Sequence, residues 1–164
     1  MMPFETILFA ADLSPQSTSA FRYALGLARD YKARLKVVYV ATPPPLVTPR
    51  ELQRMLEDAN GYRADLENCL RQTYPADSLS NVDYCVLEGD PVMELLEAAR
   101  YPHCGLIVVG THGRTGLSRA LLGSVAEAVI RRADCPVLVV KSLMEPLPAI
   151  EPALAELQPK AAGG

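Results

Sequence analysis

The chain has 164 residues, of which 49% are hydrophobic and 21% are charged, as expected for one globular domain with a core of its own. A formal net charge of −3 argues against a surface that binds nucleic acid or an anionic membrane. No stretch approaches the ~18 apolar residues of a membrane span, and the first residues lack the positive charge of a signal peptide, so we expect a cytoplasmic protein.

The four cysteines are scattered through the chain, at Cys69, Cys85, Cys104 and Cys135. None of them forms a C-x-x-C pair, which argues against a zinc site and against a disulfide framework. We therefore expect buried free thiols.

Strand and helix patterns alternate from the start of the chain. A short apolar run at Thr6–Ala11 predicts a strand buried on both faces, and Leu35–Val40 predicts a second strand that is rich in β-branched residues. Between them, Ser14 and Pro15 are typical of the N-cap and the first residue of a helix. The chain is thus expected to begin with a strand, a helix and a strand.

The next segment predicts one long helix. Thr48–Glu51 has the pattern of a capping box with proline at its favoured place, and apolar residues at helical spacing continue to Tyr74-Pro75, where the helix ends. A third, weaker strand at Val82–Leu87 is expected at the sheet edge because Asp83 interrupts its apolar pattern. The turn at Gly89–Pro91 then leads into a capped helix.

The last elements follow the same alternation. Leu106–Val109 predicts a fourth strand, Ser124–Arg132 a helix, and Pro136–Val140 a strongly apolar fifth strand. We expect a single domain at 1–142 and, because prolines and alanines then dominate, a tail at 143–164 outside the core. A short helical turn of the tail docked on the domain is the alternative.

This alternation predicts a five-stranded parallel sheet with helices on both faces, which is the three-layer, doubly wound α/β class. Proteins of this class bind ligands beyond the carboxyl ends of their strands. Asp12, Val40 and Gly110 lie at the carboxyl ends of the first, second and fourth predicted strands. We therefore expect these three residues to face one crevice.

A glycine-rich loop, Val108–Ser124, joins the fourth strand to the following helix. Gly110 and Gly113 can take positive φ and turn backbone N–H groups toward one point. Ser124 with Glu127 fits a capping box, which would place the positive end of the helix beside the loop. Backbone donors that converge on a helix start suit an anion, most often a phosphate.

The spacing Gly110-x-x-Gly113, nine residues, then Gly123-Ser124 resembles the ATP-binding signature of the universal stress protein family. The likeness also covers the opening ILFAADLS, the Gly89-Asp90-Pro91 turn and the closing CPVLVV. This resemblance implies a flavodoxin-like strand order, 3-2-1-4-5, and a member of the family that binds ATP. It also implies a homodimer joined through the last strand, Val137–Val140. Such an exposed apolar edge is usually paired or covered, which favours the same arrangement independently.

The resemblance also implies which residues bind the nucleotide. The triphosphate and ribose would lie against the loop and the helix start, and adenine near Val40 and the Asp12 loop. ATP would be held with Mg²⁺ or Mn²⁺, for which Asp12 is a candidate ligand. The implied set is Asp12, Val40, Gly110, Gly113, Arg114, Gly123, Ser124 and Val125.

Simpler roles remain open for these residues. The glycines could serve only a turn, Ser124 could be only a helix cap, and Arg114 could be a solvated surface charge. Asp12 could approach the positive end of the first helix, and Val40 could belong only to the core. His112 could act as a base, although a loop histidine between glycines is more often exposed to solvent.

Three functions therefore compete. The leading hypothesis is a regulatory, stress-response module that binds ATP, because the loop has no Walker lysine, no paired carboxylates and no Ser–His–Asp arrangement. The enzyme alternative is a slow ATPase or autophosphorylating protein that uses Asp12 or His112, with Ser124 or a nearby threonine as acceptor. The third is a dimeric scaffold without nucleotide.

Overall fold

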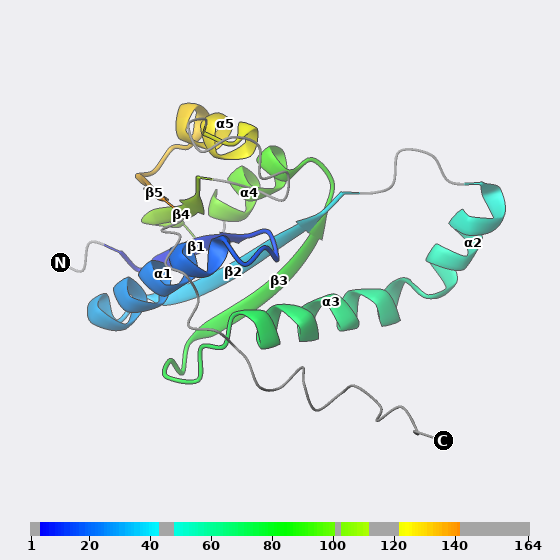
Figure 1. Cartoon of the computed structure of the whole chain (residues 1–164), viewed down its shortest axis with the longest axis horizontal. Coiled ribbons are helices and arrows are strands. Elements are labelled where there is room, and N and C mark those ends of the chain that lie inside the picture. Colours follow the sequence, from blue (N-terminus) through cyan, green and yellow to red (C-terminus); the bar gives the residue numbers. More distant parts are fainter. Residues whose placement is uncertain (1–3, 43–47, 101–102, 112–121, 142–164) are drawn as a thin grey trace, which may run out of the picture.

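A five-stranded parallel sheet forms the centre of the molecule, in the order β3-β2-β1-β4-β5 (Figure 1). The computed structural model describes residues 4–42, 48–100, 103–111 and 122–141. The strands are β1 (Thr6–Ala11), β2 (Arg34–Ala41), β3 (Val82–Glu88), β4 (Leu106–Gly110) and β5 (Val137–Val140). The predicted fold class, the strand order and the edge position of the third strand are confirmed. The predicted tail at 143–164 lies outside the described residues.

Helices cover both faces of the sheet. They are α1 (Ser17–Tyr31), α2 (Pro49–Glu57), α3 (Ala59–Thr73), α4 (Pro91–Arg100) and α5 (Ser124–Arg132). Because successive strand side chains point to opposite faces, Ile7 and Phe9 of β1 pack with α1 and α3, whereas Leu8 packs with α4 and α5. None of the helices that the structure describes is long and apolar enough to cross a membrane.

The strand registers bring the carboxyl ends to one edge of the sheet. Ala11 of β1 pairs with Tyr39 of β2, and Gly110 of β4 pairs with Val140 of β5. Asp12, Thr42 and Thr111 follow these strands directly and therefore emerge at the same edge. This edge is the one at which doubly wound proteins bind ligands.

Three aromatic rings fix the end of α3 against the sheet. The centroid of the Tyr74 ring lies 5.1 Å from that of Phe9 and 5.2 Å from that of Phe21, and the Phe9 and Phe21 centroids are 5.5 Å apart. All three side chains are buried. Tyr74 caps α3 by donating its N–H to the Leu70 carbonyl at 2.8 Å. Tyr74, at which the sequence pattern predicts the end of a helix, is thus also part of the core.

The predicted long helix is wrong, because two helices meet at Asp58. Its capping box is present: Thr48 donates its N–H to Glu51 Oε2 at 2.8 Å, and Glu51 donates its N–H to Thr48 Oγ1 at 3.3 Å. However, Asp58 leaves helical geometry at φ −108° and ψ 10°, and Gly61 just beyond it is a poor helix former. In Figure 1, α2 extends away from the sheet while α3 runs along β3.

Two other local predictions are corrected. The helix α1 begins at Ser17 and not after Ser14, because the Ser14 hydroxyl bonds to Asp12 instead of capping the helix. Cys69 is exposed rather than buried, although Cys104 is buried and all four thiols are free. By contrast, Asp90 caps α4 as expected, since its Oδ1 accepts the Met93 N–H at 2.9 Å.

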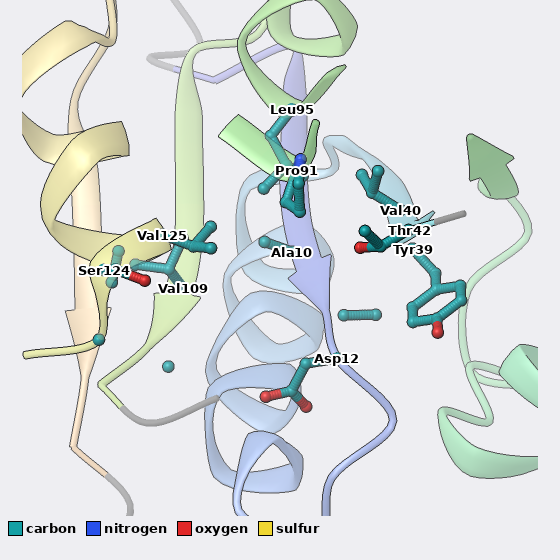
Figure 2. A pocket seen from close by; sticks show the side chains of 14 residues that line it. Ala10, Asp12, Tyr39, Val40, Thr42, Pro91, Leu95, Val109, Ser124 and Val125 are labelled. Carbon is teal, nitrogen blue, oxygen red and sulfur yellow. The ribbon is translucent and has the colours of Figure 1, made fainter. Parts of the chain in front are cut away.

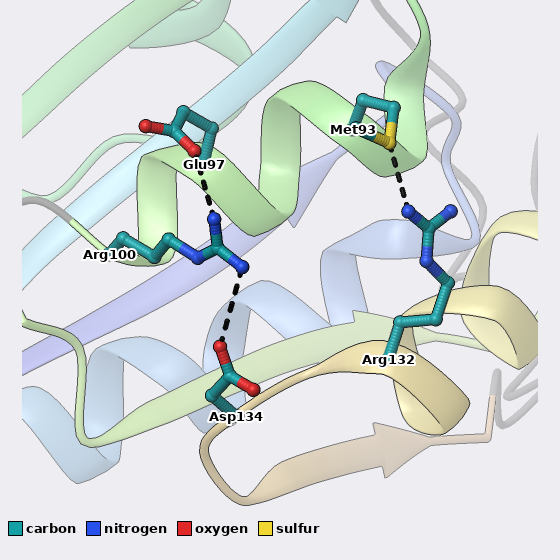
Figure 3. Close-up of polar contacts among 5 residues, drawn as sticks. All are labelled: Met93, Glu97, Arg100, Arg132 and Asp134. Carbon is teal, nitrogen blue, oxygen red and sulfur yellow. Dashed lines mark hydrogen bonds and ion pairs between the residues drawn. The ribbon is translucent and has the colours of Figure 1, made fainter.

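Exposed polar contacts join α4 to α5 and the turn after it (Figure 3). Arg100 lies 3.5 Å from Glu97 and 3.6 Å from Asp134, and Arg132 donates to Met93 Sδ at 2.9 Å. Ion pairs this exposed contribute little to stability, about 0–1 kcal/mol each. The buried apolar contacts of these helices with the sheet hold the layer together.

Two glycines provide an opposed pair of stability tests. Gly89 has φ +144°, and a Cβ there would lie 2.9 Å from Glu94 Oε1, so Gly89→Ala should lower the free energy of unfolding by about 1–3 kcal/mol. Gly26 lies within α1 with nothing within 4 Å of an added Cβ, so Gly26→Ala should raise it by about 0.5–1 kcal/mol. Urea denaturation of both variants checks this. If the two substitutions changed the free energy of unfolding equally, the difference in backbone conformation between Gly89 and Gly26 would not explain their effects.

Candidate functional site

A cavity of about 380 Å³ lies at the carboxyl edge of the sheet (Figure 2). Its walls come from the ends of β1, β2 and β4 and from the first turns of α4 and α5. Figure 2 shows Val40 and Thr42 on one side, Ser124 and Val125 on the other, and Asp12 at one end. The lining residues are Ala10, Ala11, Asp12, Tyr39, Val40, Thr42, Pro91, Leu95, Val109, Gly110, Gly123, Ser124, Val125 and Ala126.

The lining is apolar with a few polar groups at its margins. Val40, Val109 and Val125 contribute branched apolar side chains, while Asp12 and Ser124 contribute oxygen atoms. This combination is typical of small-molecule sites, in which apolar walls give affinity and a few polar groups orient the ligand. The volume also falls in the usual range for such sites, about 300–1,000 Å³.

The Asp12 carboxylate is held by its own loop. Its Oδ1 accepts the Ser14 N–H at 2.8 Å and the Ser14 hydroxyl at 2.6 Å. Both bonds end on the same oxygen, so the orientation of the carboxylate at the end of the cavity is defined.

Between Asp12 and Ser14, the backbone of Leu13 is left-handed, with φ +61°. The Leu13 N–H donates to the Tyr74 hydroxyl at 3.0 Å, and that hydroxyl also bonds to Ser17 Oγ at 2.5 Å. Burial raises the pKa of the Tyr74 hydroxyl above its usual value, the charge of Asp12 raises it further, and the Leu13 N–H that the hydroxyl accepts lowers it. The hydroxyl is therefore a neutral hydrogen-bonding group at ordinary pH.

The other side of the cavity is formed where β4 ends and α5 begins. Thr111 donates its N–H to the Val140 carbonyl at 3.1 Å, and Gly123 donates its N–H to the Thr111 carbonyl at 2.8 Å. These bonds place the first turn of α5 directly beside the end of β4. The first N–H groups of α5 have no acceptors within the helix, and the residues that carry them line the cavity.

The predicted capping box at Ser124 is wrong. Gly123 is the N-cap, with φ −62° and ψ 148°, and its carbonyl accepts the Glu127 N–H at 2.9 Å. Glu127 turns the other way, toward Arg131 at 3.1 Å, because a carboxylate and a cation four residues apart on a helix attract each other. Ser124 is thus the first helical residue.

Gly110 also differs from its predicted conformation. It is the last residue of β4, and the one described glycine with positive φ is Gly89. Gly110 lines the cavity from the end of β4.

Six of the eight predicted binding residues come together around the cavity: Asp12, Val40, Gly110, Gly123, Ser124 and Val125. The other two, Gly113 and Arg114, lie outside the described residues, as does His112.

The sequence interpretation missed several wall residues. Pro91 was expected only in the turn before a helix, and Leu95 of α4 was not expected at the site, yet both line the cavity. Thr42 could have been predicted from the sequence as a wall residue, because it directly follows β2 at the carboxyl edge of the sheet. Tyr74 does not line the cavity, and nothing in the sequence indicates its role beside the site, since its hydroxyl reaches Leu13 across 61 residues of sequence.

These features define a doubly wound α/β protein with a ligand-sized cavity near its topological switch point, between β1 and β4. The family model described as "Universal stress protein family" matches residues 3–141. The chain belongs to the universal stress protein family.

Known proteins are similar along nearly their whole length. A universal stress protein of Methanocaldococcus jannaschii is 34% identical over 144 residues, which cover 84% of this chain and 82% of the relative. The structure of universal stress protein UspA from Lactobacillus plantarum has a TM-score of 0.71 at 27% identity, covering 82% of this chain and 96% of that one. A universal stress protein solved in complex with cAMP has a TM-score of 0.63 at 24% identity, covering 85% and 99%.

The raised pKa of Tyr74 predicts a loss of stability at alkaline pH. The folded state favours the neutral hydroxyl. The stability that this hydroxyl contributes to the folded protein is therefore complete below pH ~10, and it is lost as the pH rises through the pKa of Tyr74 in the folded state. Tyr74→Phe should therefore unfold more easily than the wild type at pH 8, and this difference should shrink above pH 10. Urea denaturation at both pH values measures it, and a difference that stays constant would contradict the assignment. Because burial also raises the pKa of Tyr84, the substitution should remove only part of the alkaline decline.

Proposed function

We propose that this protein binds ATP in the cavity and acts in the cytoplasm as a nucleotide-dependent regulatory module of a stress response. The observation that carries the proposal is the meeting of an apolar wall, the Asp12 carboxylate and the N-terminus of α5 at one cavity. Adenine needs apolar surface, ribose needs hydrogen-bond acceptors, and phosphates need N–H donors. Membership of the family and the similar protein solved with cAMP support a nucleotide as the ligand.

In the proposed complex, the phosphates lie toward the start of α5. The backbone N–H groups of Ser124 and Val125 would donate to phosphate oxygens, with the positive end of the helix dipole behind them. Gly113 and Arg114, by resemblance to the family signature, would complete this side of the site. The adenine would lie against Val40, across the cavity.

The metal proposal rests on Asp12. In the ranges that the structure describes, no three side chains of His, Cys, Asp or Glu lie close enough together to hold a metal ion. Mg²⁺ or Mn²⁺ would therefore be held jointly by the nucleotide phosphates, water and Asp12, as Mg²⁺ with nucleotides often is.

A slow ATPase or an autophosphorylating protein remains the enzyme alternative. Ser124 is exposed at the start of α5 and could accept a phosphoryl group. Incubation with γ-labelled ATP tests this directly: turnover or label on the wild type, absent from a Gly113→Val control, would favour the enzyme over the regulatory module. A chain that retains no nucleotide through purification and binds none would favour the scaffold.

We also propose a homodimer joined through β5. This strand is an edge of the sheet, and Val137, Leu138 and Val139 are only half-buried there. Pairing two such edges would satisfy their backbone groups and cover the apolar side chains.

The nucleotide proposal is tested by substituting the glycines of the signature. Gly123→Val and Gly113→Val should each weaken ATP binding at least about tenfold, because branched side chains would block backbone approach to the phosphates. Equilibrium titration with ATP and a fluorescent analogue measures the affinity. Gly26→Ala, remote on α1, is the control and should bind as the wild type does. Unchanged affinity in both valine variants would refute the assignment.

The dimer proposal predicts a solution mass of twice the 17.8 kDa chain. Sedimentation equilibrium at micromolar concentration measures it, with and without ATP. A mass of one chain under both conditions would contradict pairing through β5.

A further inference from the structure

We propose that the buried Tyr74 hydroxyl is a positioning group for the nucleotide site, although Tyr74 does not line the cavity. It holds the loop that carries Asp12 by accepting the Leu13 N–H at 3.0 Å. This inference rests on the proposed function and assigns to it a residue that would not touch the ligand.

The conformation of Leu13 requires an external partner. A residue with a side chain costs about 1–2 kcal/mol to place in the left-handed region. The Asp12–Ser14 bonds are internal to the loop, so they shape it without fixing where it lies on the sheet. The Tyr74 bond reaches the loop from the end of α3 and supplies that missing constraint.

The direction of the bond between Tyr74 and Ser17 follows from the other partner of Ser17. Ser17 donates its hydroxyl proton to the Ser14 carbonyl at 2.8 Å, so it cannot also donate to Tyr74. Tyr74 must therefore donate its own proton to Ser17 Oγ while accepting from Leu13. Phenylalanine at position 74 would keep the ring and lose both bonds.

The position of the hydroxyl is itself rigid. The Tyr74 ring is completely buried against Phe9 and Phe21, whose ring centroids lie close to its own. A group this well fixed can impose one position on a surface loop. This position of the loop matters for binding. When the loop also samples positions that cannot bind the nucleotide, the apparent affinity falls in proportion to the fraction of molecules in the binding-competent position.

Tyr74→Phe tests the proposal, with Tyr84→Phe as a matched control. Both variants lose one phenol hydroxyl whose pKa is raised by burial, but the Tyr84 hydroxyl bonds to the Tyr74 carbonyl and not to residues 12–14. We expect Tyr74→Phe to weaken MgATP binding about 3- to 10-fold, the range that corresponds to one hydrogen bond, and Tyr84→Phe to change it less than twofold. Titration measures the affinity, and circular dichroism checks that both variants fold.

A double substitution separates positioning from general stability. With Asp12→Ala there is no carboxylate left to position, so adding Tyr74→Phe should weaken binding less than twofold further while still lowering stability. Full additivity of the two effects on affinity would overturn the proposal. So would equal weakening by the two phenylalanine variants.

The wild type provides an independent test through the reciprocity of coupled equilibria. If the Leu13–Tyr74 bond favours ATP, then ATP must favour the bond, and hydrogen exchange of the Leu13 amide should slow when ATP is bound. An unchanged exchange rate in the saturated protein would overturn the inference. If the wild type binds ATP and Tyr74→Phe binds it equally well, only this inference fails. If the wild type binds no ATP, the proposed function fails and the inference fails with it.

Discussion

Burial of β1 on both faces is the constraint on which the rest of the structure depends. Its side chains alternate between two apolar layers, and its backbone pairs with β2 on one side and β4 on the other. A strand placed in this way cannot slip by one residue without exchanging the two layers. The position at which β1 ends is therefore fixed, and with it the point at which Asp12 leaves the sheet. Parallel pairing then sets the ends of β2 and β4 at the same edge, which explains why one cavity collects residues from distant parts of the sequence.

Much of this arrangement could be predicted because it depends on the periodicity of apolar residues and on the order of strands and helices along the chain. Apolar strands alternating with amphipathic helices leave few topologies, and the family resemblance selected the strand order that the structure has. The failures are local competitions between similar energies. Asp58 breaks a helix whose apolar spacing continues through it, and Glu127 pairs forward with Arg131 where a capping box was expected. For Glu127 two arrangements were acceptable from the sequence, a capping box with Ser124 and an ion pair with Arg131, and the structure has the ion pair.

The candidate site was predictable to the extent that its residues end strands or start helices. Val40 and Gly110 lie at the carboxyl ends of β2 and β4, and Asp12 directly follows β1. Leu95 was harder to identify, because one side chain serves both the core and the cavity wall. Tyr74 could not be found at all from the sequence, since a tyrosine at the end of a helix gives no indication of which distant N–H its hydroxyl accepts. Long-range polar contacts of this kind have no periodicity to read.

The glycine N-cap of α5 has a consequence for how ligand and fold depend on each other. Most helices satisfy their first N–H groups with a serine, threonine or aspartate side chain, but no side chain among the described residues caps α5. In the proposed complex, an arriving phosphate would displace no internal acceptor and would itself complete the helix. The nucleotide would then serve as a structural part of the domain, added after synthesis, and the first turn of α5 would report whether that part is in place.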